Sequence, residues 1–347
     1  MKTILLSLIF LFSALNAFSA VKTWDGGGAD PNWTTAANWV GDVAPVINDD
    51  LVFPATAAQF TANNNFSILT TFRSVTIEGG NYTIGGQALR INGGLTVNGG
   101  TQTLTTIVNL GAAQTFFGAQ GSTTTIAVLS VGNFALTIDG AGNFLIGLIT
   151  GTGAITKNGA GAALIAAANN FSGSLTINNG ILINDAIIPN SPVTVNGGTI
   201  GGQTGFTGFG GTGTIGATNV AAGVISSGTL ESPTGILNIT GGLTFTANGN
   251  YVSKLSGTTP GANGHDQLNV TGTVTLNNAR FVPLFFNNFR PAIGDSFTIL
   301  RNDGTDAIIG TFLNAPENSV FVGALNTAFR ITYQGGDGND IVITRVV

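Results

Sequence analysis

The chain has 347 residues, of which 52 are Gly and 8% are charged, and its formal net charge is -5. The charged fraction is far below the roughly 25% of an ordinary soluble domain, but 43% of the residues are hydrophobic, which argues against disorder. Lys and Arg are scattered rather than clustered, which argues against a nucleic-acid partner. The chain has no Cys, which excludes disulfides and thiolate metal sites.

Residues 1–20 are expected to be a secretory signal peptide. Lys2 gives a positive start, residues 4–15 form an apolar core, and residues 17–20 offer a cleavage site with small residues. The apolar core is short for a membrane span, and the alternative is a retained N-terminal anchor. We expect a mature chain that starts at Val21, has no integral membrane span, and is secreted, extracellular or at the cell surface.

Residues 21–60 are expected to form an N-terminal cap. All three Trp residues of the chain lie here, at positions 24, 33 and 39, among several Asp and Pro residues. A stack of β-strands has an open end that must be covered, and terminal repeats of such stacks are atypical in sequence. The alternative is that the Trp rings are exposed and stack on sugar rings.

Residues 61–275 are dominated by a returning phrase of aliphatic, Thr or Asn, aliphatic, one or two polar residues and Gly. The phrase begins at Val75, Leu95, Leu136, Leu175, Val193, Leu237 and Leu268. Most of the intervals between these positions lie near one or two multiples of about 20 residues, which is typical of a stacked β-repeat. Gly-Gly and Asn-Gly pairs supply the turns between short strands.

A sandwich or barrel also has regular short strands, but it does not require one phrase at multiples of about 20 residues. We therefore predict an all-β fold, a right-handed parallel β-helix or solenoid. Residues 276–347 are rich in Phe and contain further strand-like runs. They are predicted to form a distinct C-terminal β-rich cap.

The stretch from Gly151 to Gly180 resembles the autotransporter-associated β-strand repeat. The matching positions are Lys157, Gly159, Gly161, Asn169, Phe171, Gly173 and Gly180. The strand after Gly161 departs from the pattern, because it is rich in Ala where the family usually alternates Thr and Leu. The resemblance implies a right-handed parallel β-helix in a secreted or surface-exposed passenger. The membrane barrel that follows such a passenger in autotransporters is not expected here, because a barrel needs many strands of about ten residues.

Gly335-Gly-Asp337-Gly-Asn-Asp340-Ile-Val342-Ile matches the calcium-binding nonapeptide. Sites of that kind are built between stacked copies, and this chain has one copy. The alternative is a Gly-rich hairpin or coil corner before a final strand. We therefore predict no metal site, and Asp337 and Asp340 are the candidates if calcium does bind.

No residue pattern points to catalysis. His265 and Asp266 are adjacent, but no Ser is indicated as a triad partner, and a surface turn is the expected setting. The acids of the repeat region are far apart in sequence, at Glu78, Asp139, Asp185, Glu231 and Asp266, whereas sugar-cleaving sites need clustered carboxylates.

The sequence therefore predicts a secreted, non-catalytic β-helix protein without a cofactor. It would serve as a structural or adhesin-like element at the cell surface or outside the cell, with surface glycans or other cell-surface proteins as partners. The alternative is a β-helix protein that binds carbohydrate or degrades polysaccharide.

Overall fold

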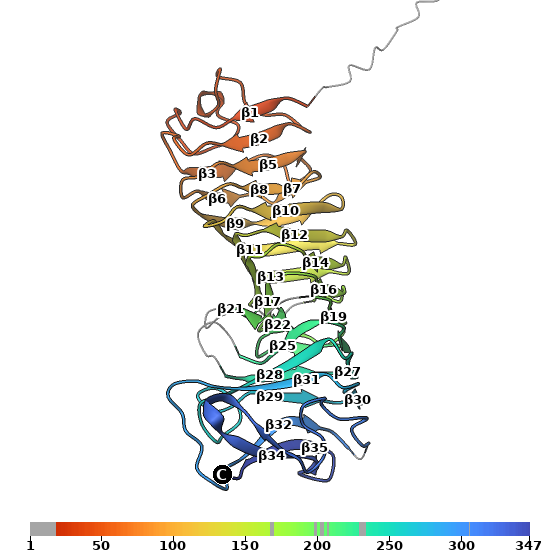
Figure 1. The fold of residues 1–347 in the computed structure, drawn as a ribbon. Helices are drawn as coiled ribbons and strands as arrows, with labels where there is room; N and C mark the ends of the chain where they lie inside the picture. The colour runs from red at the N-terminus through yellow and green to blue at the C-terminus, as the bar shows by residue number, and fades with distance from the viewer. Residues whose placement is uncertain are drawn as a thin grey trace, which may run out of the picture.

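The computed structural model describes residues 19–166, 170–197, 200–201, 205–206, 208–228, 234–304 and 306–347. The predicted signal peptide lies almost entirely outside these residues. The described chain is a parallel β-solenoid, as predicted: strands stack as successive rungs of a rod with the first described residues at one end and the C-terminus at the other (Figure 1). Its only helices, within the described residues, are two short 3₁₀ turns at Ala36–Asn38 and Ala324–Asn326.

One long side of the rod is a twelve-stranded sheet in which all described pairings are parallel. In spatial order its strands are β1 (Val21–Thr23), β2 (Asp50–Phe53), β5 (Ser74–Ile77), β8 (Leu95–Val97), β10 (Gln114–Gly118), β12 (Leu136–Gly140), β14 (Ile155–Lys157), β16 (Leu175–Ile177), β19 (Val193–Val195), β24 (Thr218–Val220), β27 (Leu243–Phe245) and β30 (Val274–Thr275). The sheet begins inside the predicted cap, because β1 and β2 already pair in parallel with the solenoid.

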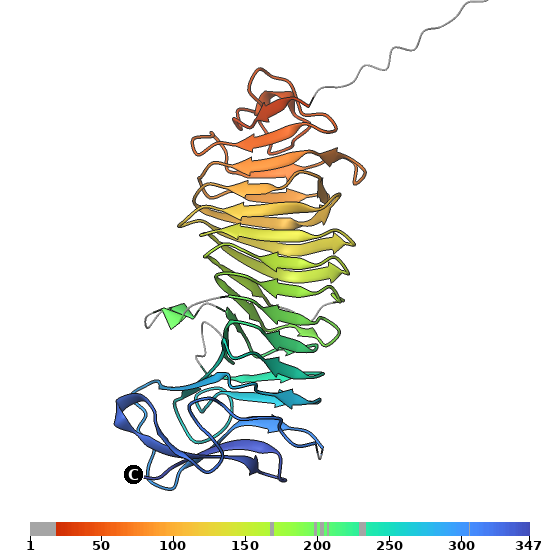
Figure 2. The same cartoon turned by 45° about the vertical axis from the view of Figure 1, so that its right-hand side comes forward.

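A thirteen-stranded sheet forms a second side, and Figure 2 shows its strands stacked with those of the first sheet along the rod. Its strands are β3 (Thr61–Asn64), β6 (Thr83–Gly86), β9 (Thr101–Leu110), β11 (Thr123–Gly132), β13 (Asn143–Gly151), β15 (Ala162–Ile165), β17 (Ile181–Asn184), β22 (Gly208–Gly210), β25 (Gly223–Ile225), β28 (Gly249–Leu255) and β31 (Arg280–Phe285), with β4 (Thr71–Phe72) and β7 (Leu89–Ile91) beside this path. Its long strands β9 and β11 have a register shift between Ile126 and Val128. Irregularities of this kind bend a strand, so one long strand can follow a corner of the rod.

An eight-stranded sheet forms a third side of the C-terminal half. Its strands are β18 (Ile187–Ile188), β23 (Thr214–Ile215), β26 (Ile236–Ile239), β29 (Gln267–Val270), β32 (Ser296–Asn302), β35 (Asp340–Arg345), β34 (Ala328–Gly335) and β33 (Val320–Val322). A small antiparallel pair, β20 (Ile200–Gly201) and β21 (Gly205–Phe206), stands apart from the three sheets. The phrases at Leu237 and Leu268 lie in this third sheet, whereas the five earlier ones lie in the twelve-stranded sheet.

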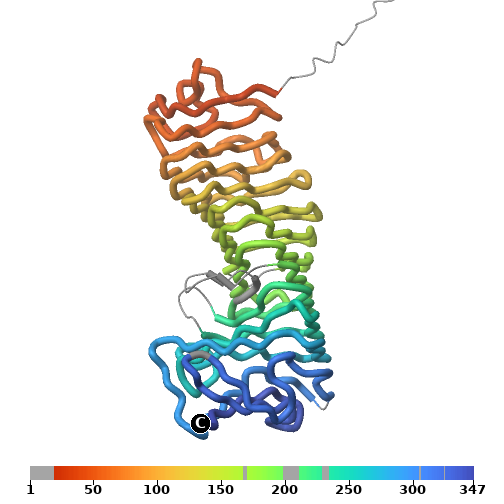
Figure 3. Tube along the Cα trace, viewed as in Figure 1, coloured from red at the N-terminus to blue at the C-terminus, as the bar shows by residue number. Residues whose placement is uncertain are grey.

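The C-terminal end closes by changing strand direction. Strand β32 pairs in parallel with β29 on one edge and antiparallel with β35 on the other. Strands β35, β34 and β33 then continue as an antiparallel meander, and the chain path folds back on itself at this end of the tube (Figure 3). The parallel sheets thus run past residue 275, through β31 and β32, before the cap begins.

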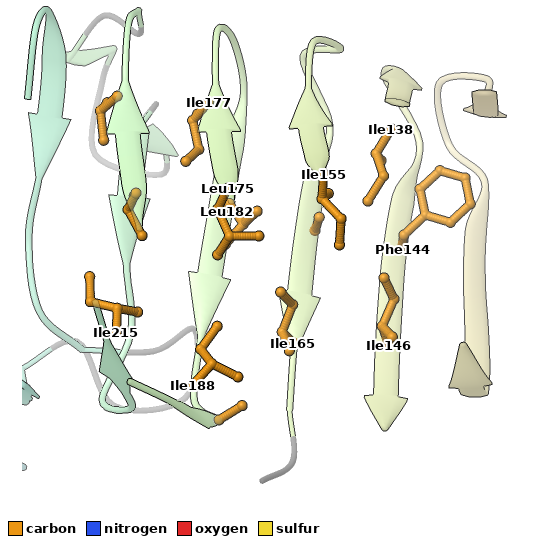
Figure 4. Close-up of a cluster of buried hydrophobic side chains, with 14 of the residues drawn as sticks. Ile138, Phe144, Ile146, Ile155, Ile165, Leu175, Ile177, Leu182, Ile188 and Ile215 are labelled. Atoms are coloured by element: carbon orange, nitrogen blue, oxygen red, sulfur yellow. The ribbon is translucent and has the colours of Figure 1, made fainter. Parts of the chain in front are cut away.

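The core is built from aliphatic columns that run along the rod. Leu136, Ile155, Leu175 and Val193 follow one another in register on β12, β14, β16 and β19, and all four are buried. Figure 4 shows this interior, where Ile146 and Ile165 lie side by side on successive rungs. Burial of each Leu, Ile or Val side chain stabilises the fold by about 1.5–3 kcal/mol. The main role of the repeated sequence pattern is therefore to supply the hydrophobic core.

Glycine is required at particular corners of the rod. Gly140 has φ +84°, and a Cβ on it would lie 2.0 Å from the carbonyl oxygen of Gly118 on the preceding rung. Gly121 has a similar φ of +82°, but a Cβ there would meet nothing within 4 Å. A side chain at Gly121 would therefore meet only backbone strain, whereas a side chain at Gly140 would meet backbone strain and a steric clash.

We predict that Gly140→Ala destabilises the protein more than Gly121→Ala. The second substitution should cost about 1–2 kcal/mol, the penalty of a left-handed conformation for a residue with a Cβ, and the first adds a backbone clash to that penalty. Urea unfolding followed by far-ultraviolet circular dichroism measures both. Equal losses would show that the rungs can separate at this corner without cost.

Candidate functional site

The outer face of the twelve-stranded sheet carries a row of Thr side chains. Thr137, Thr156, Thr176 and Thr194 occupy equivalent positions on consecutive strands β12, β14, β16 and β19. They alternate with the buried aliphatic residues of the same strands, because successive side chains of a strand point to opposite faces. All four are partly exposed, so the row presents the same hydroxyl and methyl groups on each rung.

A second row consists of Asn residues two positions after the Thr residues. Asn178 donates to Asn158 Oδ1 at 2.8 Å, and Asn196 donates to Asn178 Oδ1 at 3.0 Å. These three Asn residues are exposed. Cross-strand amide ladders stabilise stacked strands, and they also leave a polar surface without charge.

The three Trp residues are not available to a ligand. Trp24, Trp33 and Trp39 are each 0% exposed, and the rings of Trp24 and Trp39 meet edge to face with 5.3 Å between centroids. Trp24 Nε1 donates to Gln59 O, and Trp39 Nε1 donates to Trp33 O, both at 2.8 Å. The alternative that they stack on sugar rings is therefore wrong, and they pack as the core of the N-terminal end.

The prediction that His265 and Asp266 lie in a surface turn is also wrong. His265 is 1% exposed and Asp266 is 0% exposed. Asp266 Oδ2 lies 2.5 Å from Lys254 Nζ, and it also accepts hydrogen bonds from Ser226 Oγ at 3.1 Å and from the Lys254 backbone N–H at 3.0 Å. Asp266 Oδ1 accepts from the Gly235 backbone N–H at 3.0 Å.

Burial dominates the electrostatics of this pair. It raises the pKa of Asp266 and lowers the pKa of Lys254, and the attraction between the two groups opposes both shifts. Burial likewise lowers the pKa of His265, whose ring lies edge to face with Phe297 at 5.3 Å. Ser226 and Lys254 are also buried, at 5% and 4% exposed, so the cluster is an internal polar network that a polymer cannot reach.

Sequence reasoning missed Lys254 as a member of this network. A signal was present, because Lys254 lies in the run Tyr251-Val-Ser-Lys-Leu255, where a charge interrupts a strand that is otherwise buried. Its partner could not be found in the same way. Asp266 is 12 residues away along the chain and Ser226 is 28 residues away, and only the stacking of rungs brings them together.

The other acids of the repeat region that the structure describes, Glu78, Asp139 and Asp185, do not form a cluster. Asn98 donates to Glu78 at an exposed corner at 2.7 Å, and Asp185 accepts from Thr212 at 3.0 Å. Glu231 lies outside the described residues. Within the described ranges, no three His, Asp or Glu side chains are grouped so that they could hold a metal ion.

Lys157, part of the family-like pattern, occupies a position in an aliphatic column. It lies between Ile138 and Ile177 in the register of β12, β14 and β16, and it is 1% exposed. Its ammonium group donates to the carbonyl oxygen of Gly159. Burial lowers the pKa of Lys157 to about 8, and the nearby Asp139 acts in the opposite direction.

The stability of the protein should therefore rise between about pH 7.5 and 9.5. In this window unfolded Lys157, with a pKa near 10.5, keeps its proton while the folded form loses it. The cost of burying the charge is thereby removed, and linkage gives a gain of about 2 kcal/mol. Above pH 10 the raised pKa of Tyr82 reverses the trend, because the unfolded phenol then ionises first.

Urea unfolding at several pH values measures this effect, and Lys157→Met is the matched control. The variant should show a smaller rise over the same window, because the lowered pKa of the buried Lys254 acts in the same direction. A rise of equal size in the variant would mean that another group is responsible.

The calcium-like motif lies in an antiparallel hairpin. Gly335 ends β34, Asp340 begins β35, and the two residues face each other in the ladder. Asp337 is exposed in the turn, whereas Asp340 is buried. This is the alternative that the sequence left open, a Gly-rich hairpin before a final strand, and the motif does not lie between stacked parallel rungs.

No protein-family model and no curated protein matches this chain. In the part of the chain that the structure describes, no helix has the length and apolar character needed to cross a membrane.

Proposed function

We propose that this chain is a secreted, non-catalytic β-solenoid that acts as a structural or adhesin-like rod at the cell surface or in the extracellular matrix. The supporting observation is the outer face of the twelve-stranded sheet, where Thr and Asn side chains recur in register on consecutive rungs. Rungs of a parallel sheet are about 4.8 Å apart, so the face offers one set of uncharged hydrogen-bonding groups many times over.

Repetition favours attachment to a partner that is itself repetitive. A single Thr or Asn contact is weak, but contacts linked on one rigid rod act together, and the overall avidity can far exceed the affinity of any one of them. A surface glycan or an array of cell-surface proteins has the required regularity. The N-terminal sequence, with its expected signal peptide, supports export to the place where such partners occur.

The test is binding of the purified mature chain to a glycan array and to intact cells. The variant Thr156→Arg/Thr176→Arg places two bulky charges on the proposed face. The matched control Thr103→Arg/Thr125→Arg places the same charges on the thirteen-stranded sheet, where Thr103 and Thr125 are also in register and partly exposed. Binding should be lost in the first variant and retained in the control.

Binding that survives both variants would contradict the proposal for this face. Incubation with the same glycans, followed by measurement of new reducing ends, addresses the carbohydrate-degrading alternative. Depolymerisation that is lost on replacing one acid would overturn the non-catalytic assignment.

A further inference from the structure

Oxygen atoms converge where the loop after β32 meets the turn between β34 and β35. Asn339 Nδ2 lies 3.3 Å from Asp303 O, 3.1 Å from Gly304 O and 3.2 Å from Asp306 O. Asn302 Nδ2 donates to the same Asp306 carbonyl at 3.0 Å. Two side-chain amides and three backbone carbonyls therefore share one small volume.

Acceptors outnumber donors in this volume. The Asn339 amide has two hydrogens for the three carbonyl oxygens around it. The amide oxygens of Asn302 and Asn339 have no hydrogen-bond partner, although the two residues are only 1% and 3% exposed. Buried polar atoms are nearly always paired, so unpaired oxygens on two amides that bind the same Asp306 carbonyl point to a partner that is not part of the chain.

A buried carboxylate lies beside Asn302, one of the two amide residues. Asp340 is 6% exposed, and its Oδ1 accepts a hydrogen bond from the Asn302 backbone N–H at 3.0 Å. Gly336 allows the turn to approach this carboxylate, because it has φ +58° and a Cβ there would lie 2.1 Å from Asp340 Oδ2. The charged groups that act on Asp340 are Asp337 and Arg301, and burial raises its pKa.

We propose that these groups form a calcium site, with ligands drawn from the carbonyl oxygens of Asp303, Gly304 and Asp306, the amide oxygens of Asn302 and Asn339, and the carboxylate of Asp340. Calcium binds six to eight oxygen atoms of these three kinds in flexible geometry, whereas magnesium requires a stricter octahedron and dehydrates reluctantly. Rotation of a side-chain amide exchanges its nitrogen for its oxygen in nearly the same place, so Asn339 can turn an oxygen toward the carbonyl group.

The site differs from the nonapeptide arrangement that the sequence indicates. Asp337 is exposed and is not a ligand here, and four of the six ligand residues come from the end of β32 and the loop after it rather than from a second copy of the motif. One carboxylate gives a low ligand charge, which places the dissociation constant in the range of about 10⁻⁴–10⁻³ M that is typical of extracellular modules. The proposal does not depend on the adhesive role of the rod.

The test is calorimetric titration of the EGTA-treated full chain with CaCl₂, together with melting temperatures in calcium, in magnesium and in EGTA. We expect saturable binding at one site and a melting temperature that rises with calcium more than with magnesium. Asp340→Asn should weaken binding by about tenfold or more. Asp337→Asn, in the same hairpin turn, removes a neighbouring charge but no ligand and should weaken binding much less than Asp340→Asn.

A second variant, expected to raise calcium affinity, keeps the test informative if Asp340→Asn folds poorly. Asn339→Asp adds a carboxylate of nearly the same shape and should bind calcium more tightly than the natural chain. Absence of saturable binding up to about 10 mM calcium would overturn the site and leave ordered water as the partner of the two amides. Unchanged affinity in both Asp340→Asn and Asn339→Asp would also overturn it.

Discussion

Lys254→Met is expected to lower the free energy of unfolding by about 3–5 kcal/mol, because it leaves the buried Asp266 carboxylate without its cation. Lys254 and Asp266 lie 2.5 Å apart, and their side chains are 5% and 0% exposed. Asp266→Asn should cause a loss of similar size by leaving the buried ammonium group without a counterion. Urea unfolding of each variant measures the two losses.

The double variant Lys254→Met/Asp266→Asn distinguishes a charge pair from simple packing. It removes both charges and keeps one side-chain oxygen, which can accept from the Gly235 N–H or from the Lys254 N–H but not from both, because Asp266 binds them with different oxygens. The double loss should be smaller than the sum of the single losses by about 1–3 kcal/mol. Additive losses would mean that the pair is not coupled.

A half-exposed ion pair serves as the comparison. Arg73 is bound to Asp50, but its side chain is 57% exposed. Surface pairs contribute little because water and salt screen them, so Arg73→Met should have a much smaller effect than Lys254→Met. A similar loss in both would show that burial does not set the cost.

Trp39→Ala is expected to destabilise the protein by about 3–5 kcal/mol, the usual cost of truncating a large buried aromatic residue. Trp39 is 0% exposed and lies against Trp24, Trp33 and Phe53. The substitution also opens the N-terminal end of the stack, whose strands then become available for pairing with other chains. Thermal unfolding with light scattering should show a lower melting temperature and earlier aggregation.

The neighbouring Val40 provides the control for this prediction. It is 59% exposed, so Val40→Ala should change stability by less than about 0.5 kcal/mol. Equal effects of the two substitutions would contradict the assignment of the Trp cluster as the core of the cap.

The predicted strands agree with the structure where the local pattern carries the signal. Leu95, Leu136, Leu175 and Val193 all begin a strand of the twelve-stranded sheet, because period-two alternation is a property of the strand itself. The phrases at Leu237 and Leu268 look the same in sequence, but they lie in the third sheet. Which side of the rod a strand occupies depends on how far the chain has turned since the last rung, and the phrase does not encode this.

For the candidate sites as well, local sequence indicates the turns and strands but not the contacts between distant residues. The Gly335–Asp340 motif was visible as a turn before a strand, and it is a hairpin. The partners of its buried carboxylate were not visible, because Asn302 lies 38 residues away from Asp340. His265 and Asp266 followed a run of turn-forming residues, which favoured the surface, but the stacking of β28 against its neighbours buries them.

The sequence by itself therefore determined the all-β solenoid and its repeated aliphatic core, since both follow from side-chain alternation within single strands and from a period along the chain. Only the tertiary structure decided that the Trp residues are core, that Lys254 pairs with Asp266, and that amide and carbonyl oxygens meet at the C-terminal hairpin. Those contacts join residues on different rungs. They depend on the length and bend of every intervening loop, which local pattern does not specify.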